Sequence, residues 1–186
     1  MLCVLSSHCR DARSPTLRML RWIGGGNRRQ PLYLIRVAAQ IRKCGASVTG
    51  AEGRRALIVE DEGITASLLA DELAETGFRT VGIADTAASA VAVFERERPD
   101  LVIADVRLRE GDGISAARPM EKQGAAVMFI TAHCFDLVMS SGVGIACLQK
   151  PFEPDIIGLA ALAVLHYEQH GAKPAWAPSE LHFIKH

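Results

Sequence analysis

Leu101-Val102-Ile103-Ala104-Asp105 (LVIAD) is the stretch of sequence that decides the fold. Four apolar residues follow Pro99 and Asp100, and they predict a short strand buried on both faces, as strands inside parallel sheets are. Asp105 then stands at the carboxyl end of that strand, where open α/β sheets bind their ligands. Alternatively, Asp105 only begins the loop over 106–113. The neighbouring segments decide between these two interpretations.

The remainder of the sequence from 56 onward alternates between short apolar runs and amphipathic segments. An α/β fold follows, with a doubly wound, flavodoxin-like parallel sheet of five strands in the order 2-1-3-4-5. Pro119 is expected to shorten or kink the third helix. The expected strands are 56–59, 80–84, 101–105, 126–130 and 145–148, and the expected helices are 64–76, a helix capped by Thr86, one from about Ile114, and one from Ile156 to Tyr167.

The chain divides by charge into three parts. Residues 1–55 hold eleven Lys and Arg against two acids, although the formal net charge of the 186 residues is zero. This basic extension shows no sustained periodicity, so we expect it to be poorly structured and assign it no function. The domain over 56–167 is acidic, and the tail over 168–186 contains Pro174 and Pro178 and is expected to be irregular.

Composition also limits the cellular setting. No apolar run approaches the roughly 18 residues needed to cross a bilayer, and no signal peptide is evident, so we expect a cytoplasmic protein without a membrane role. The five cysteines are an odd number without a Cys-x-x-Cys pair. That pattern favours free thiols over a disulfide framework or a zinc site.

Carboxylates and a lysine follow strands that should lie side by side. Glu60 and Asp61 end the first strand and Asp105 ends the third, and these strands are neighbours in the predicted sheet. Three carboxylates in one pocket repel each other, so a divalent cation or an ammonium group must compensate. Magnesium prefers such oxygens, and Lys150 and Thr131 follow the fifth and fourth strands. This set suits an aspartate that attacks a phosphoryl group.

These segments together resemble the receiver domain of two-component response regulators. The resemblance covers 56–167, about 112 of the 186 residues, and leaves the extension unexplained. It is carried by LIVEDE (57–62), DLVIADVRL (100–108), Gly-Asp-Gly (111–113), FITA (129–132) and QKPF (149–152).

The resemblance implies that Asp105 accepts a phosphoryl group from a histidine kinase or a phosphotransfer protein. Lys150 would contact the phosphoryl group, and Thr131 would donate a hydrogen bond to it. By the same resemblance the Lys150–Pro151 peptide bond is cis. The protein would not be an enzyme beyond its own phosphoryl transfer and autodephosphorylation.

The resemblance also implies a magnesium ion as cofactor. Asp61 and Asp105 would bind Mg²⁺ directly, Glu60 would bind it through water, and the backbone carbonyl of Arg107 would complete the protein ligands. Arg107 and His133 occupy positions that tune how fast the phosphoryl group is lost in this family.

Two features depart from the family. Cys147 stands where an aromatic residue usually changes rotamer on activation, so that switch cannot operate here. The segments between Asp105, Thr131 and Lys150 are short, which puts the fourth helix in doubt.

The last helix, Ile156 to Tyr167, is apolar on more than one face. It either packs on a second protomer or a partner, or is covered by the tail or the extension.

Few residues follow this helix, so we expect a single-domain regulator that signals through protein contacts. One alternative is a receiver-like interaction module that works without phosphorylation. An aspartate-nucleophile phosphatase is disfavoured because Arg107 occupies the place of its second aspartate. A nucleic-acid binder that acts through the basic extension is the third and least favoured alternative.

Overall fold

The computed structural model describes residues 51–184. The expectations about residues 1–50, including the basic extension, the nucleic-acid alternative and the thiols of Cys3, Cys9 and Cys44, therefore lie outside the described residues. Among the described helices, none is long and apolar enough to cross a membrane.

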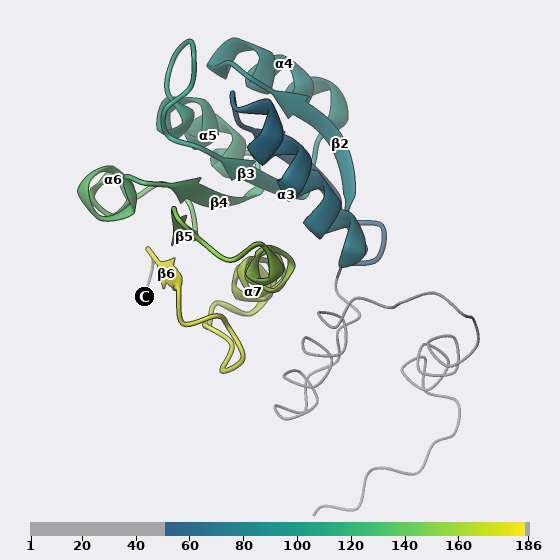
Figure 1. The fold of residues 1–186 in the computed structure, drawn as a ribbon, viewed down its shortest axis with the longest axis vertical. Helices are drawn as coiled ribbons and strands as arrows, with labels where there is room; N and C mark the ends of the chain where they lie inside the picture. Colours follow the sequence, from purple (N-terminus) through teal and green to yellow (C-terminus); the bar gives the residue numbers. More distant parts are fainter. Residues whose placement is uncertain (1–50, 185–186) are drawn as a thin grey trace, which may run out of the picture.

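The centre of the fold is a six-stranded sheet in the order β2-β1-β3-β4-β5-β6 (Figure 1). Five strands are parallel and in the predicted order, which confirms the doubly wound α/β prediction. The sixth strand is new and runs antiparallel to β5. The strands are β1 (Arg55–Val59), β2 (Arg79–Ala84), β3 (Leu101–Ala104), β4 (Ala126–Thr131), β5 (Ala146–Gln149) and β6 (Leu181–Phe183).

Strand β6 corrects the expectation of an irregular tail. Leu181 and Phe183 are buried against the sheet, whereas His182 between them is half-buried. This is the alternation of a half-buried strand, but it spans only three residues and follows two prolines. A pattern that short does not stand out in the sequence.

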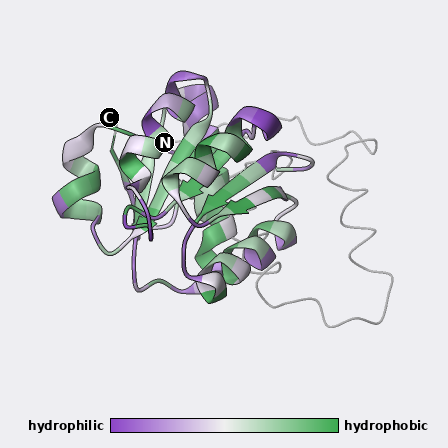
Figure 2. Cartoon of the chain, turned by 90° about the horizontal axis from the view of Figure 1, so that it is seen from above, coloured by the Kyte–Doolittle hydropathy of each residue, from purple (hydrophilic) through white to green (hydrophobic). Residues whose placement is uncertain are grey.

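Helices cover both faces of the sheet. Helices α4 (Ala87–Glu97) and α5 (Gly113–Lys122) lie on one face, and α3 (Gly63–Glu75) and α7 (Ile157–His170) lie on the other. Each face has its own apolar core, and Figure 2 shows hydrophobic strands between helices with hydrophilic outer surfaces. The buried strands therefore read as continuous apolar runs, as the sequence indicated.

Local signals for the helix ends are largely confirmed. Thr86 caps α4 with a reciprocal capping box to Ser89. Gly77 has φ of +94° just beyond α3, a conformation that favours glycine. Pro119 does not end α5, which continues to Lys122.

The segment after β4 is short, as expected. It consists of a single π-helical turn, Cys134–Val138, followed by α6 (Met139–Ser141). The turn lies against β4 and β5 at the end of the sheet where β6 is added.

A disulfide between Cys134 and Cys147 contradicts the expectation of free thiols. The fold brings the turn after β4 next to β5, so that the two Cα atoms lie 5.9 Å apart. The cysteines are 13 positions apart in the sequence, and this spacing matches no short motif that would reveal the pairing.

The chain itself covers the apolar last helix. A 3₁₀ turn (Pro154–Ile156) precedes α7, and most of the apolar residues of α7 are buried. Trp176 and Phe183 from the C-terminal segment belong to the core that α7 joins, and the rings of Tyr167 and Phe183 lie 5.2 Å apart. Of the two alternatives, the structure supports coverage by the tail.

Candidate functional site

Three backbone hydrogen bonds fix the candidate site at the carboxyl edge of the sheet. The amide of Asp105 donates to the carbonyl of Val59, and the amide of Glu60 donates to that of Ala84. The amide of Lys150 donates to the carbonyl of Thr131. Each bond extends the pairing of two strands by one residue, so the side chains that follow leave the sheet from rigid positions.

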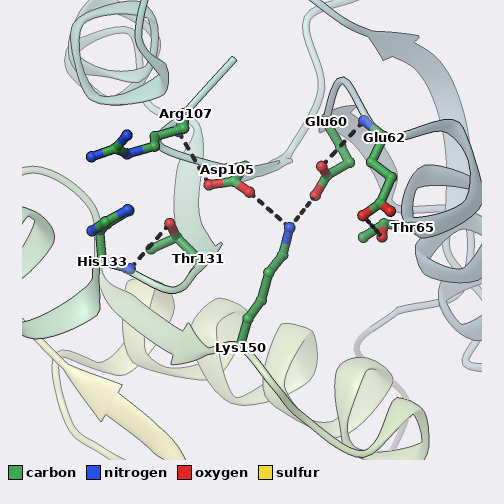
Figure 3. A network of polar contacts seen from close by, with 8 residues as sticks. All are labelled: Glu60, Glu62, Thr65, Asp105, Arg107, Thr131, His133 and Lys150. Carbon is green, nitrogen blue, oxygen red and sulfur yellow. Dashed lines mark hydrogen bonds and ion pairs between the residues drawn. The ribbon is translucent and has the colours of Figure 1, made fainter. Parts of the chain in front are cut away.

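Lys150 joins two carboxylates from different strands. Its Nζ lies 2.7 Å from Oε2 of Glu60 and 2.7 Å from Oδ2 of Asp105 (Figure 3). The side chain of Glu60 is 2% exposed, that of Asp105 12% and that of Lys150 24%. The ammonium group therefore compensates for the repulsion predicted between these acids.

Burial and ion pairing act in opposite directions on this network. Burial raises the pKa of Glu60 above its ordinary value, and the hydrogen bond from Lys150 offsets this only in part. Burial alone would lower the pKa of Lys150, but its hydrogen bonds to Asp105 and Glu60 raise it. Lys150 is thus charged at neutral pH, and Glu60 is the group whose charge is costly.

A loop beyond β3 shapes the surroundings of Asp105. The amide of Arg107 lies 3.2 Å from Oδ1 of Asp105, and Arg107 pairs with Asp112 in an isolated bridge. Gly113 approaches so closely that a Cβ there would lie 1.8 Å from the carbonyl oxygen of Asp105. Only glycine fits this contact. The sequence motif included Gly113, but its role is visible only in the structure.

Glu62 is a further residue whose role was missed. Its amide donates to Oε1 of Glu60 at 3.3 Å, and its carboxylate accepts a hydrogen bond from Thr65 at 2.7 Å. The turn after β1 thereby orients the Glu60 carboxylate towards Lys150. The sequence motif gave roles to Glu60 and Asp61 but none to Glu62.

Thr131 and His133 lie on the other side of the Asp105 carboxylate in Figure 3. Thr131 is fully buried, and its Oγ1 accepts a hydrogen bond from the amide of His133 at 3.3 Å. The imidazole of His133 lies 3.0 Å from the carboxylate of Asp136, which lowers the pKa of that acid. The orientation of the Thr131 hydroxyl thus depends on the backbone at His133.

The structure brings some of the predicted magnesium ligands close together, but not all of them. Glu60 and Asp105 face each other across Lys150, and Arg107 is two residues beyond Asp105. Asp61 follows Glu60 and is half-buried, and the Lys150 ammonium group bonds to Glu60 and Asp105 rather than to Asp61. Within 51–184, no three His, Cys, Asp or Glu side chains are arranged to hold a metal ion. The oxygen donors have the right chemistry for Mg²⁺, whose binding stays a prediction.

This arrangement suits nucleophilic chemistry at Asp105. One carboxylate oxygen contacts an ammonium group and the other a backbone amide, and the side chain keeps some access to solvent. Negative charge that develops on a phosphoryl group attached here would lie beside Lys150. The cis peptide bond before Pro151 is confirmed.

Comparisons with known proteins agree with this geometry. The family model described as the response regulator receiver domain matches residues 56–161. The transcriptional regulatory protein PdtaR of Mycobacterium tuberculosis is 39% identical over 121 residues, which are 62% of this chain and 59% of PdtaR. Chemotaxis protein CheY of Bacillus subtilis is 34% identical over 76 residues, 41% of this chain and 63% of CheY. The chain thus spans about three fifths of these relatives.

Solved structures show the same fold. The receiver domain of the PhyR response regulator of Erythrobacter litoralis has a TM-score of 0.58 and 28% identity, covering 62% of this chain and 92% of that one. The anti-anti-sigma factor PhyR of Bartonella quintana has a TM-score of 0.57 and 25% identity, covering 73% of this chain and 56% of that one.

Proposed function

Because this chain belongs to the response regulator receiver domain family, we propose that it is a phosphorylatable switch whose Asp105 accepts a phosphoryl group from a histidine kinase or a phosphotransfer protein. The observation that supports this most directly is the position of Asp105, which shares the ammonium group of Lys150 with the buried Glu60.

The transfer would proceed by attack of an Asp105 carboxylate oxygen on the phosphorus of a phosphohistidine. A P–O bond forms while the P–N bond breaks, and the leaving imidazole nitrogen takes up a proton. Lys150 neutralises charge on the phosphoryl oxygens, and Thr131 donates its hydroxyl hydrogen to one of them.

Magnesium would be held by Asp61, Asp105 and the Arg107 carbonyl, with Glu60 bound through water, and would neutralise further charge on the phosphoryl group. Glu60 can take this role while it contacts Lys150. Its Oε1 accepts a hydrogen bond from Glu62 and its Oε2 one from Lys150, and each oxygen keeps a second lone pair for a water molecule.

The test is intact mass after incubation of the full chain with Mg²⁺ and acetyl phosphate. We expect wild type to gain about 80 Da, one phosphoryl group, and Asp105→Asn to gain none. Asp71→Asn is the matched control, because it makes the same Asp-to-Asn change at an exposed position of α3 and should still be labelled. Absence of labelling in wild type, with no binding of Mg²⁺, would contradict the proposal.

Signal output would occur through protein contacts in the cytoplasm. PhyR of B. quintana, whose structure resembles that of this chain, is an anti-anti-sigma factor. By that likeness, phosphorylation of Asp105 would change the affinity of this chain for a partner protein. A pull-down with wild type and Asp105→Asn, each treated with acetyl phosphate, would show a difference between them.

A second candidate is a receiver-like interaction module that works without phosphorylation. The observation in its favour is Cys147, which is tied into a disulfide at the position of the usual mobile aromatic. Partner binding that is equal in wild type and Asp105→Asn would favour this candidate. We do not propose a phosphatase, because Arg107 stands two residues after Asp105, and steady turnover of a small phosphoester would count against that choice.

A further inference from the structure

The Cys134–Cys147 disulfide joins the two segments that carry Thr131 and Lys150. Cys134 begins the π-helical turn three residues after Thr131, and Cys147 lies in β5 three residues before Lys150. Both cysteines are fully buried. The bridge therefore restrains the position of the turn after β4 relative to the strand that delivers Lys150.

The turn after β4 has irregular hydrogen bonds and mostly exposed side chains. The amides of Leu137 and Val138 both donate to the single carbonyl of His133, so the turn lacks the one-to-one hydrogen bonds of a regular α-helix. Phe135 is 60% exposed and Leu137 is also exposed, although the Phe135 ring lies 4.7 Å from that of His182. Besides Cys134, only Val138 of this turn is fully buried. Segments with irregular hydrogen bonds and little burial open locally at low free-energy cost.

We propose that Cys134 and Cys147 form a reversible redox site, reduced by a dithiol, and that its redox state controls the mobility of residues 132–142 beside Asp105. The link to phosphorylation rests on the function proposed above. Disulfides in reducing compartments are usually transient and redox-sensing. A cysteine pair in the cytoplasmic location proposed above, placed between the segments that carry Thr131 and Lys150, suits redox control of residues 132–142.

The exchange is balanced by the dithiol. A thiolate of the reductant attacks the Sγ of Cys134, forms a mixed disulfide, and releases Cys147 as a thiolate that takes up a proton. The second thiol of the reductant then attacks the reductant's other sulfur, which is bonded to Cys134 in the mixed disulfide. The reductant leaves as a disulfide, and Cys134 leaves as a thiol.

Burial of the bridge makes reduction depend on local opening. Phe135, next to Cys134, and Ala132, two residues before it, are exposed, so opening of the turn gives the reductant a route to the sulfur. After reduction, the turn is no longer joined to β5. The amide of His133, which orients the Thr131 hydroxyl, then gains freedom.

Hydrogen exchange of the full chain tests the proposal, with dithiothreitol as the dithiol. We expect reduction to speed amide exchange within 132–142 at least tenfold, and exchange in α4 to stay unchanged. Peptide mapping after alkylation should find Cys134 and Cys147 protected before reduction and alkylated after it. Cys134→Ser should exchange like the reduced wild type, and Cys44→Ser is the matched control that keeps the bridge.

Three results would overturn the proposal. The first is alkylation of Cys134 and Cys147 in the folded, untreated chain, and the second is equal exchange in both redox states. The third is an equal rate of labelling by acetyl phosphate in both states, where we expect at least a threefold difference. Lack of any labelling would refute the phosphoacceptor function alone, because exchange and alkylation need no phosphorylation and can be repeated on Asp105→Asn.

Discussion

Lys150 compensates for the charge of two carboxylates that come from separate strands. Glu60 is almost fully buried, so its ionised form depends mainly on this ammonium group, with a smaller contribution from the amide of Glu62. If the cation is removed, burial and the charge of Asp105 both raise the pKa of Glu60 further. The same residue that would stabilise a phosphoryl group therefore also stabilises the unphosphorylated site.

Replacement of this lysine should lower stability in a way that depends on pH. We expect Lys150→Met to reduce the free energy of unfolding by about 2 kcal/mol at neutral pH, because it leaves a buried carboxylate unpaired. The added change Glu60→Gln should recover part of this loss. Urea unfolding of both variants measures the difference.

The pH dependence follows from the raised pKa of Glu60. The folded state of Lys150→Met binds a proton at Glu60 more readily than the unfolded chain, whose carboxyl has the ordinary value of 4.5. Stability gained from that proton is fully present below 4.5 and is lost as pH rises through the folded pKa. The stability lost through Lys150→Met should therefore shrink as pH falls from neutral towards 4.5. A constant deficit would contradict this account.

Arg107 and His133 should affect the lifetime of the phosphorylated protein. The amide of Arg107 contacts the Asp105 carboxylate, and the amide of His133 contacts the Thr131 hydroxyl, so both residues border the reacting group. We expect Arg107→Ala and His133→Ala each to change the rate of phosphoryl loss. Decay of labelled protein, followed by intact mass, measures this rate. Unchanged lifetimes in both variants would contradict the prediction.

Helix α5 begins beside the site and depends on one cap. The carboxylate of Asp112 accepts a hydrogen bond from the amide of Ser115 at 2.9 Å. Burial would raise the pKa of Asp112, but hydrogen bonds from Ser115 outweigh it and lower the pKa below 3.8. The cap also holds the loop in which Gly113 contacts Asp105, so its loss acts on the site as well as on the helix.

Asp112→Ala should cost about 1 kcal/mol of stability, the usual value of such a cap. Because the pKa of Asp112 is lowered, the charge-dependent part of the cap is present above the unfolded value of 3.8 and is lost as pH falls through the folded pKa. Thermal or urea unfolding at neutral pH measures the cost. Asp112→Asn is the control, since asparagine caps equally well, and an equal loss in both variants would refute the assignment.

The sequence predicts most of these helices and strands, for identifiable reasons. Buried parallel strands such as β3 read as short apolar runs, and Thr86 and Gly77 mark helix ends by well-known local chemistry. The pairing of Lys150 with Asp105 also follows, because both leave the same edge of the sheet. The role of Glu62 could not be predicted, since it depends on a backbone amide that donates to Glu60 and on the position of Thr65.

The C-terminal segment covers both α7 and the edge of β5. Two features at this end were not predictable, namely strand β6 and the disulfide. Both depend on tertiary proximity: β6 is three residues long, and Cys134 meets Cys147 only once β4 and β5 are paired. Short-range sequence patterns carry no information about contacts between distant segments.

Removal of the buried side chain of β6 should destabilise the whole fold. We expect Leu181→Ala to lower the free energy of unfolding by about 3 kcal/mol, because Leu181 is fully buried among residues of α7 and the sheet. Glu180→Ala, at an exposed neighbouring position, should change it by less than about 0.5 kcal/mol. Denaturant unfolding checks both, and equal effects would show that β6 packs only marginally.

Strand β6 has a consequence for the synthesis of the protein. About 30 residues separate β5 from the strand that covers its edge, and at about 5 to 20 residues per second these take roughly 1.5 to 6 s to make. During this interval the ribosome presents a nascent chain whose sheet has a bare edge next to an apolar helix. Unpaired edges are templates for association between chains. Slow codons between β5 and β6 would lengthen the period of greatest exposure to aggregation and to chaperones.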